Sequence, residues 1–110
     1  MVDLSASNAA LVRDVIEASG APAVLLDGQG VAQALSPAMQ ALIPGVAVGK
    51  LLALVLRDPD LNDAIEQVAI EGGRKTVELV ERVPVERTFR IHIAALHDSG
   101  LRHATLLTFQ

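Results

Sequence analysis

Apolar residues recur in steps of three and four near the start of the chain. Over residues 8–19 this spacing predicts a short amphipathic helix, with charged residues on the side away from its apolar stripe. Ser7 or Asn8 is expected to cap its first turn, because a side-chain oxygen accepts hydrogen bonds from the free amide groups there. The stripe is too small to fold alone, so it must pack on the sheet, on a second copy of the chain, or on both. It consists of Leu11, Val12, Val15 and Ile16.

A continuous apolar run over residues 22–27 predicts a strand that is buried on both faces and therefore central in a sheet. An extended segment over residues 31–35 follows it after the sequence Asp-Gly-Gln-Gly. A dinucleotide-binding loop would need a third glycine where Gln33 stands and would open a helix. We therefore interpret these four residues as a hairpin turn, in which Asp27 supplies a side-chain acceptor and Gly28 a permissive backbone.

Two helix starts are marked by a capping side chain followed by proline. Ser36 before a proline predicts a short helix over residues 36–43. Asp58 before a proline predicts a longer helix that ends at Gly72. Residues 49–56, between the two helices, predict a short helical or irregular segment that is too apolar to be exposed on all sides.

The last third of the chain alternates apolar and polar residues, which is typical of strands. Residues 75–83, 87–96 and 102–109 each show this pattern. Pro84 and residues 98–100 are turn signals, so the three segments predict successive antiparallel hairpins. The first two segments are expected to be outer strands and the third a central one.

Composition narrows the class of protein. The 110 residues are 51% hydrophobic and include two Phe, no Tyr and no Trp, so one domain with an aliphatic core is expected. A net charge of -4 with scattered basic residues argues against nucleic acid as a partner. The absence of cysteine excludes disulfides, thiolate nucleophiles and cysteine-ligated metals, and it fits a cytoplasmic domain. No apolar stretch approaches the ~20 residues that span a bilayer, so no membrane contact by this segment is expected.

The order of elements and three stretches of sequence resemble a PAS domain of bacterial sensor histidine kinases, most closely the phosphate-regulon type. The stretches are LLDGQGVAQALSPAMQAL, ERTFRIHIAAL and LRHATLLTFQ, and the likeness spans residues 10–110. It implies an α+β fold, a five-stranded antiparallel sheet in the order 2-1-5-4-3 with short helices on one face. Residues 1–110 would be a single PAS domain, and we expect it to be a fragment of a longer kinase whose remainder is anchored in the inner membrane.

The resemblance implies a noncatalytic sensory and dimerisation module that relays a signal to the kinase helices of the same parent chain. The alternative is a ligand-free structural spacer or protein-interaction domain. No cofactor is expected, because flavin photosensors of the family need a cysteine and haem-binding members use a histidine on a helix. The three histidines, His92, His97 and His103, fall in the strand region at spacings that match no zinc site. Family members often have asparagine where Ser36 stands, and the shorter serine is expected to brace the hairpin less well.

Arg90 and His92 are the sharpest candidates for a binding site. The alternation of their strand aims Phe89, Ile91 and Ile93 at the helices and leaves Arg90 and His92 in solvent, with Glu78 opposite His92. The resemblance implies the reverse orientation, and both interpretations stay open. If Arg90 and His92 face inward, they form with Met39 a pocket for a small anionic or apolar ligand. In that orientation a homodimer contact is also expected, made by Leu11, Val15, Ile16, Phe89, Ile91 and Ile93.

Overall fold

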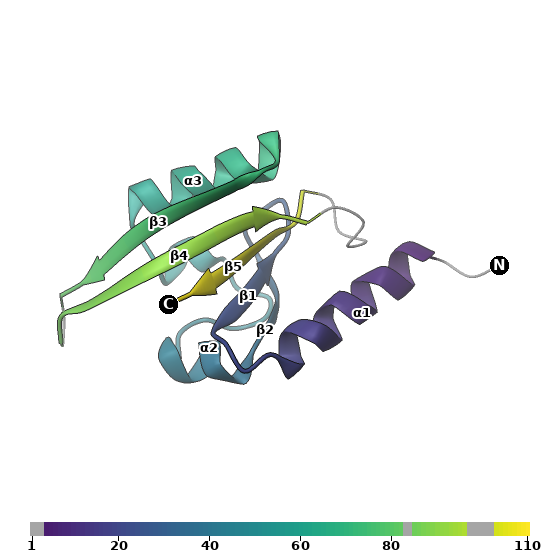
Figure 1. The fold of residues 1–110 in the computed structure, drawn as a ribbon, viewed down its shortest axis with the longest axis horizontal. Helices are drawn as coiled ribbons and strands as arrows, with labels where there is room; N and C mark the ends of the chain where they lie inside the picture. The colour runs from purple at the N-terminus through teal and green to yellow at the C-terminus, as the bar shows by residue number, and fades with distance from the viewer. Residues whose placement is uncertain (1–3, 83–84, 97–102) are drawn as a thin grey trace.

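The computed structural model describes residues 4–82, 85–96 and 103–110 (Figure 1). Within them, five strands form one antiparallel sheet, and helical segments lie on both of its faces. The elements in chain order are α1 (Leu4–Ala18), β1 (Ala23–Leu26), β2 (Ala32–Leu35), α2 (Pro37–Leu42), the 3-10 helix η1 (Leu52–Leu54), α3 (Pro59–Glu71), β3 (Arg74–Glu81), β4 (Arg87–Ala95) and β5 (Thr105–Phe109).

The strands are arranged in the order β2-β1-β5-β4-β3, which confirms the predicted order. β1 lies between β2 and β5, in agreement with its apolar character on both faces. Of the two strands expected to be outer, β3 is an edge, whereas β4 pairs with both β3 and β5 and is therefore an inner strand. The predicted turn residues Pro84 and 98–100 lie outside the described residues.

The helix boundaries follow the local sequence signals with one exception. α1 begins at Leu4, so Ser7 and Asn8 lie inside the helix and the prediction that one of them caps it is wrong. α1 ends at Ala18, one residue before the predicted end. The cap of α3 is confirmed, because the carboxylate of Asp58 accepts a hydrogen bond of 3.0 Å from the backbone amide of Leu61. None of the helices in the described residues combines the length and the apolar character needed to cross a membrane.

The inner face of the sheet packs against α2, η1 and α3 and forms the main core. β1, β4 and β5 contribute fully buried aliphatic side chains from their inward positions, and α3 covers them with its apolar stripe. The core contains no charged side chain. Its most deeply buried members are Val24, Leu26, Met39, Leu52, Leu61, Val68, Ile91, Ile93 and Leu107.

The outer face of the sheet is covered by α1 only over β1 and β2. Ile16 is 4% exposed and packs with Leu25 and Ala34 in a second, smaller cluster. Val12 and Leu106 lie at the margin of this cluster. The N-terminal half of α1 extends past the sheet, whereas the outer faces of β4 and β3 carry no helix within the described residues (Figure 1).

Ser36 joins three elements through one buried hydroxyl. Its Oγ donates to the carbonyl of Ala21 (2.6 Å) and accepts from the backbone amides of Ala23 (3.0 Å) and Met39 (3.2 Å). These bonds connect the start of β1, the end of β2 and the first turn of α2. The shorter serine therefore does brace this region, because the backbones approach closely enough for its hydroxyl.

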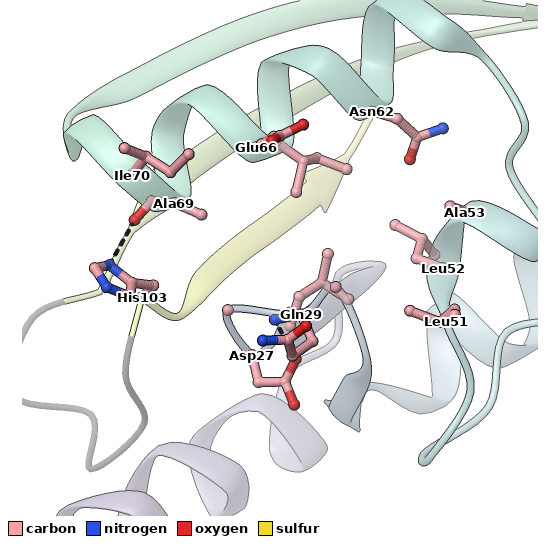
Figure 2. Close-up of a pocket in the computed structure, with 14 residues that line it drawn as sticks. Asp27, Gln29, Leu51, Leu52, Ala53, Asn62, Glu66, Ala69, Ile70 and His103 are labelled. Carbon is pink, nitrogen blue, oxygen red and sulfur yellow. Dashed lines mark hydrogen bonds between the residues drawn. The ribbon is translucent and has the colours of Figure 1, made fainter.

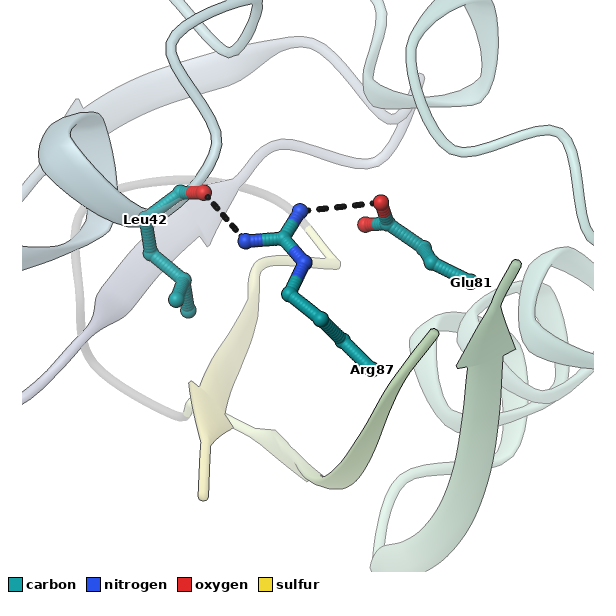
Figure 3. Close-up of polar contacts among 3 residues, drawn as sticks. All are labelled: Leu42, Glu81 and Arg87. Carbon is teal, nitrogen blue, oxygen red and sulfur yellow. Dashed lines mark hydrogen bonds and ion pairs between the residues drawn. The ribbon is translucent and has the colours of Figure 1, made fainter. Parts of the chain in front are cut away.

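Arg87 ties the turn end of the β3–β4 hairpin to α2. Its guanidinium donates to the carboxylate of Glu81 at 2.9 Å and to the carbonyl of Leu42 at 3.2 Å (Figure 3). The same guanidinium lies 5.1 Å from the ring centroid of Phe89, within the range of a cation–π contact. The terminal carbonyl groups of α2 thus gain a cationic donor, which the dipole of a helix favours at that end.

Candidate functional site

A pocket of about 370 Å³ opens where the β1–β2 turn, η1 and α3 meet (Figure 2). This volume is near the lower end of the range of ~300–1,000 Å³ that small-molecule sites occupy. Its walls are mainly apolar, and its polar groups come from the turn, from α3 and from the residue that lies two positions before β5. The apolar wall consists of Leu26, Leu51, Leu52, Ala53, Ile65, Ala69 and Ile70.

The turn of residues 27–30 is held rigidly by the side chain of Asp27. Its Oδ1 accepts from the backbone amides of Gln29 (2.8 Å) and Val31 (3.0 Å), and its Oδ2 accepts from the side chain of Gln33 at 3.0 Å. The hairpin interpretation is confirmed, since β2 and not a helix follows the turn. The permissive backbone is required at Gly30, whose φ is 81°, and not at Gly28 as predicted.

One face of α3 forms the opposite wall and carries two polar side chains. Asn62 and Glu66 are one helical turn apart and both line the pocket. The Nδ2 of Asn62 donates to the carbonyls of Leu56 and Asp58, each at 2.9 Å. Both amide hydrogens of Asn62 are thereby used, so its Oδ1 is left as an acceptor.

His103 closes the pocket beside the last turn of α3. Its Nδ1 lies 2.9 Å from the carbonyl oxygen of Ala69, as Figure 2 shows. A carbonyl can only accept, so Nδ1 carries the proton, and Nε2 is an acceptor when the ring is neutral. This contact joins α3 to the chain entering β5, with His103 itself held at a φ of 55°.

Thr105 is the buried polar residue next to this site. It is fully buried, and its hydroxyl has no hydrogen-bond partner among the described residues. In the β1–β5 register Thr105 lies opposite Leu26, and directly paired residues project to the same face of a sheet. Its side chain is therefore directed to the face on which Leu26 lines the pocket.

No family model and no curated protein sequence matches the chain significantly, but many solved structures share its architecture. The PAS domain of BvgS from Bordetella pertussis has a TM-score of 0.71 at 18% identity, over 94% of this chain and 85% of that one. The PAS domain of the histidine kinase ThkA has a TM-score of 0.63 at 13% identity, over 80% and 95%. The phage VqmA–DPO complex has a TM-score of 0.79 at 16% identity, over 98% of this chain and 54% of that one.

The chain has the PAS fold. At these identities the likeness concerns architecture alone, so the resemblance to phosphate-regulon kinases stays a prediction. In this PAS fold the pocket is bounded by the hairpin turn, the short central helices and the long helix before β3, at one end of the sheet.

The structure does not bring Arg90, His92 and Met39 together. Met39 is fully buried under the inner face of the PAS sheet, whereas Arg90 lies on the outer face with 59% of its side chain exposed. Arg90 lies 3.9 Å from Glu78, its cross-strand partner, and His92 Nδ1 lies 3.0 Å from the hydroxyl of Thr76. The predicted pairing of Glu78 with His92 is wrong by two residues, and a shared pocket of the three residues is not formed.

The strand pattern, and not the resemblance, predicts the orientation of β4 correctly. Phe89, Ile91 and Ile93 are at most 6% exposed and pack in the main core, so they are not available for a dimer contact. Ile16 is also buried, against the outer face of β1. Among the predicted contact residues, Leu11 and Val15 remain at the surface, with 63% and 62% exposure.

The histidines occupy separate environments in the described residues. His92 is on the outer face of β4, His103 contacts α3, and His97 lies outside the described residues. Within the described part of the chain, no group of three or more His, Cys, Asp or Glu side chains is placed to hold a metal ion.

Sequence reasoning did not identify the residues of the pocket. The polar side of the helix pattern over residues 59–71 directs Asn62 and Glu66 to solvent, yet Asn62 is half-buried and both residues line the pocket. The only local signal was the pair of polar residues four positions apart beside Ile65 and Ala69. Their partners in the turn and at His103 are distant in sequence, so the pattern of one helix could not reveal them.

Proposed function

We propose that this chain is a noncatalytic sensory and dimerisation module of a cytoplasmic two-component histidine kinase. A ligand in the pocket between the β1–β2 turn, η1 and α3 would change the balance between arrangements of the domain, and the attached kinase helices would respond. The coupling available is the difference in ligand affinity between those arrangements, typically about 1–3 kcal/mol. The observation that carries this proposal is an open, largely apolar pocket in a PAS fold.

The structural neighbours support the proposal by analogy. ThkA is a histidine kinase with a PAS domain, and VqmA was solved in complex with the small molecule DPO. A PAS domain of a transcriptional regulator from Burkholderia thailandensis was solved with ethanol. Small ligands in domains of this architecture make the pocket the first place to look for a signal in this chain.

A ligand screen with a blocked pocket tests the sensory role. We expect a thermal-shift screen of small metabolites to give hits with the wild-type domain that are lost in Ala53→Trp, because Ala53 is exposed and lines the pocket. Ala41→Trp is the matched control, since Ala41 is equally exposed on α2 and does not line the pocket. A screen without hits would instead favour the ligand-free structural spacer, and hits that both variants retain would contradict this pocket as the ligand site.

We propose a homodimer formed through the exposed side of α1. Leu11, Val15 and Ala18 follow one another at helical spacing and are exposed, while Ile16 holds the opposite side of the helix on the sheet. This exposed apolar row lies on a helix that projects beyond the rest of the domain, so it can pack against the same row of a second copy. Such pairing fits a PAS module of a kinase, because these modules relay signals through paired terminal helices. The arrangement of the dimer would then bias the attached kinase helices of the parent chain.

Mass measurement by light scattering tests this contact. Val15→Glu is expected to convert a dimer into a monomer without unfolding the domain, because the Val15 side chain makes little contact within its own chain. Ala10→Glu adds the same charge at an exposed position on another side of α1 and should leave the dimer intact. A mass that Val15→Glu does not alter would contradict the proposed contact.

A further inference from the structure

We infer that the pocket between the β1–β2 turn, η1 and α3 takes a small aliphatic amine that carries a second hydrogen-bonding group, such as an amino alcohol. This inference rests on the proposed sensory function and specifies the chemistry of its ligand. It differs from the anionic ligand that Arg90 and His92 indicated, because those residues lie on the other face of the sheet.

The charge of the pocket favours a cation. Glu66 carries a carboxylate on the α3 wall, and Asp27 adds a second negative charge in the turn, where its oxygens accept from Gln29, Val31 and Gln33; no lysine or arginine is among the lining residues. Within the described residues, neither carboxylate forms an ion pair with a basic side chain. An anion entering this pocket would meet two like charges and no lysine or arginine, whereas an ammonium group would meet the opposite sign.

The hydrogen-bonding groups of the α3 wall are acceptors. Asn62 uses both amide hydrogens on backbone carbonyls and keeps Oδ1 for a ligand, and Glu66 one turn later adds a carboxylate. His103 donates through Nδ1 to Ala69, which leaves Nε2 as a further acceptor in the neutral ring. Asn62 and Glu66 are one turn apart, whereas His103 lies at Ala69 in the last turn of α3 (Figure 2). An ammonium group has three donors and no acceptor, so it matches the pair of Asn62 and Glu66.

The remaining surface fits a short alkyl chain. Leu26 and Leu52 are at most 2% exposed, and Ile65 is 7% exposed, so the wall behind the acceptors is aliphatic and rigidly packed. No Tyr or Trp exists in the chain, and the two Phe do not line the pocket, which removes the ring-stacking contacts that an aromatic ligand would use. An aliphatic chain is the ligand body that such a wall accommodates.

Thr105 provides an independent observation that indicates a second polar group on the ligand. A buried hydroxyl without a partner among the described residues is costly. Thr105 is not itself a lining residue, but it lies beside Leu26 and two residues after His103, which both line the pocket. A ligand hydroxyl that reaches the sheet at this point would satisfy it. The ammonium group would then bind at Asn62 and Glu66, with the alkyl chain between the two ends.

Three matched compounds test the class of ligand: aminopentanol, pentylamine and hydroxypentanoate, measured by calorimetry or NMR titration of the wild-type domain. We expect aminopentanol to bind about tenfold more tightly than hydroxypentanoate, since the two differ mainly in the charged end. Glu66→Gln should weaken aminopentanol about fivefold, the effect of one partly exposed ion pair. Glu71→Gln is the control, because Glu71 is on the same helix but does not line the pocket.

The second polar group is tested with Thr105→Val, which keeps the shape of the side chain and removes the hydroxyl. This variant should reduce the affinity for aminopentanol to that for pentylamine and leave pentylamine unchanged. Its melting temperature should not fall, because the lost hydroxyl had no partner within the described residues. Equal wild-type affinities for aminopentanol and pentylamine would overturn the role of Thr105.

The outcomes separate this inference from the sensory proposal. Hydroxypentanoate binding as tightly as aminopentanol, or Glu66→Gln binding aminopentanol like the wild type, would overturn the cationic class. If no amine binds while the metabolite screen gives hits that Ala53→Trp abolishes, the sensory proposal stands and the amine inference fails. A screen without any hit would overturn the sensory proposal itself.

Discussion

The two faces of the sheet differ in how completely they are covered. On the inner face, alternate residues of β4 such as Ile91 and Ile93 have no exposed surface, because α2, η1 and α3 pack over them. On the outer face, the neighbouring residue Arg90 and its cross-strand partner Glu78 have side chains that are 59% and 67% exposed. The same strand therefore contributes to a closed aliphatic core on one face and to a hydrated surface on the other.

This difference locates where a signal can act. The inner face is filled by aliphatic side chains, and the pocket is found at the end of the sheet, where the β1–β2 turn and α3 diverge. The outer face is covered by α1 only over β1 and β2, through the small cluster around Ile16. Stability is thus concentrated on the inner face, while the pocket and the proposed dimer contact lie at the margins of the fold.

The largest expected effect comes from removing a side chain of the inner face. Ile91→Ala should lower the free energy of unfolding by about 2–5 kcal/mol, because it leaves a cavity in a core with no exposed surface at that position. Arg90→Ala, one residue along the same strand, should change it by about 0.5 kcal/mol or less, since its ion pair is exposed and long. Urea denaturation of both variants measures the contrast, and similar losses would contradict it.

An intermediate effect is expected where the hairpin meets the helices. Ser36→Ala should lower the free energy of unfolding by about 2 kcal/mol, because the buried amides of Ala23 and Met39 both lose their acceptor. Ser19→Ala is the matched control, since the hydroxyl of Ser19 accepts a single exposed bond from the amide of Ala21. This variant should lower the free energy of unfolding by only a few tenths of the loss expected for Ser36→Ala. If the two variants were equally stable in urea, the bracing role of Ser36 would be refuted.

The smallest effect concerns the contact between the β3–β4 hairpin and α2. Arg87→Met should lower the free energy of unfolding by about 1 kcal/mol, because it keeps an aliphatic chain beside Phe89 but loses the bonds to Glu81 and Leu42. A double-mutant cycle with Glu81→Gln isolates the ion pair and should give a coupling of about 0.5 kcal/mol, as both side chains are partly exposed. Strict additivity of the two substitutions would show that the pair contributes nothing.

Part of the candidate site could be predicted from sequence, because some of its signals are local. The turn was recognised from Asp27 and the glycines near it, and the side chain of Asp27 does accept from amides two and four residues later. The start of α3 was recognised from Asp58 and the proline that follows it. These bonds involve residues within one turn of each other, so the sequence window that encodes them is short.

The strand pattern and the resemblance gave opposite predictions for the orientation of the β4 side chains across the sheet. Alternation alone predicted that Phe89, Ile91 and Ile93 face the helices, and the resemblance to known PAS domains implied the opposite. The prediction from alternation was right because burying large apolar side chains under the helices is the orientation that most lowers the free energy of the folded state. The resemblance concerned the fold and the order of its elements, and the same fold can carry different residues on the two faces of its sheet.

By itself the sequence determined the single aliphatic domain, the order of its strands and helices, the hairpin turn and the proline-led helix starts, since periodicity and capping act over a few residues. Only the tertiary structure decided that Asn62 and Glu66 line one pocket with the turn of residues 27–30, and that His103 lies at the far end of the same helix. It also decided that Thr105 is buried without a hydrogen-bond partner among the described residues and that the serine hydroxyl reaches three backbones. These arrangements bring together groups tens of residues apart, and their geometry is set by the packing of the whole core.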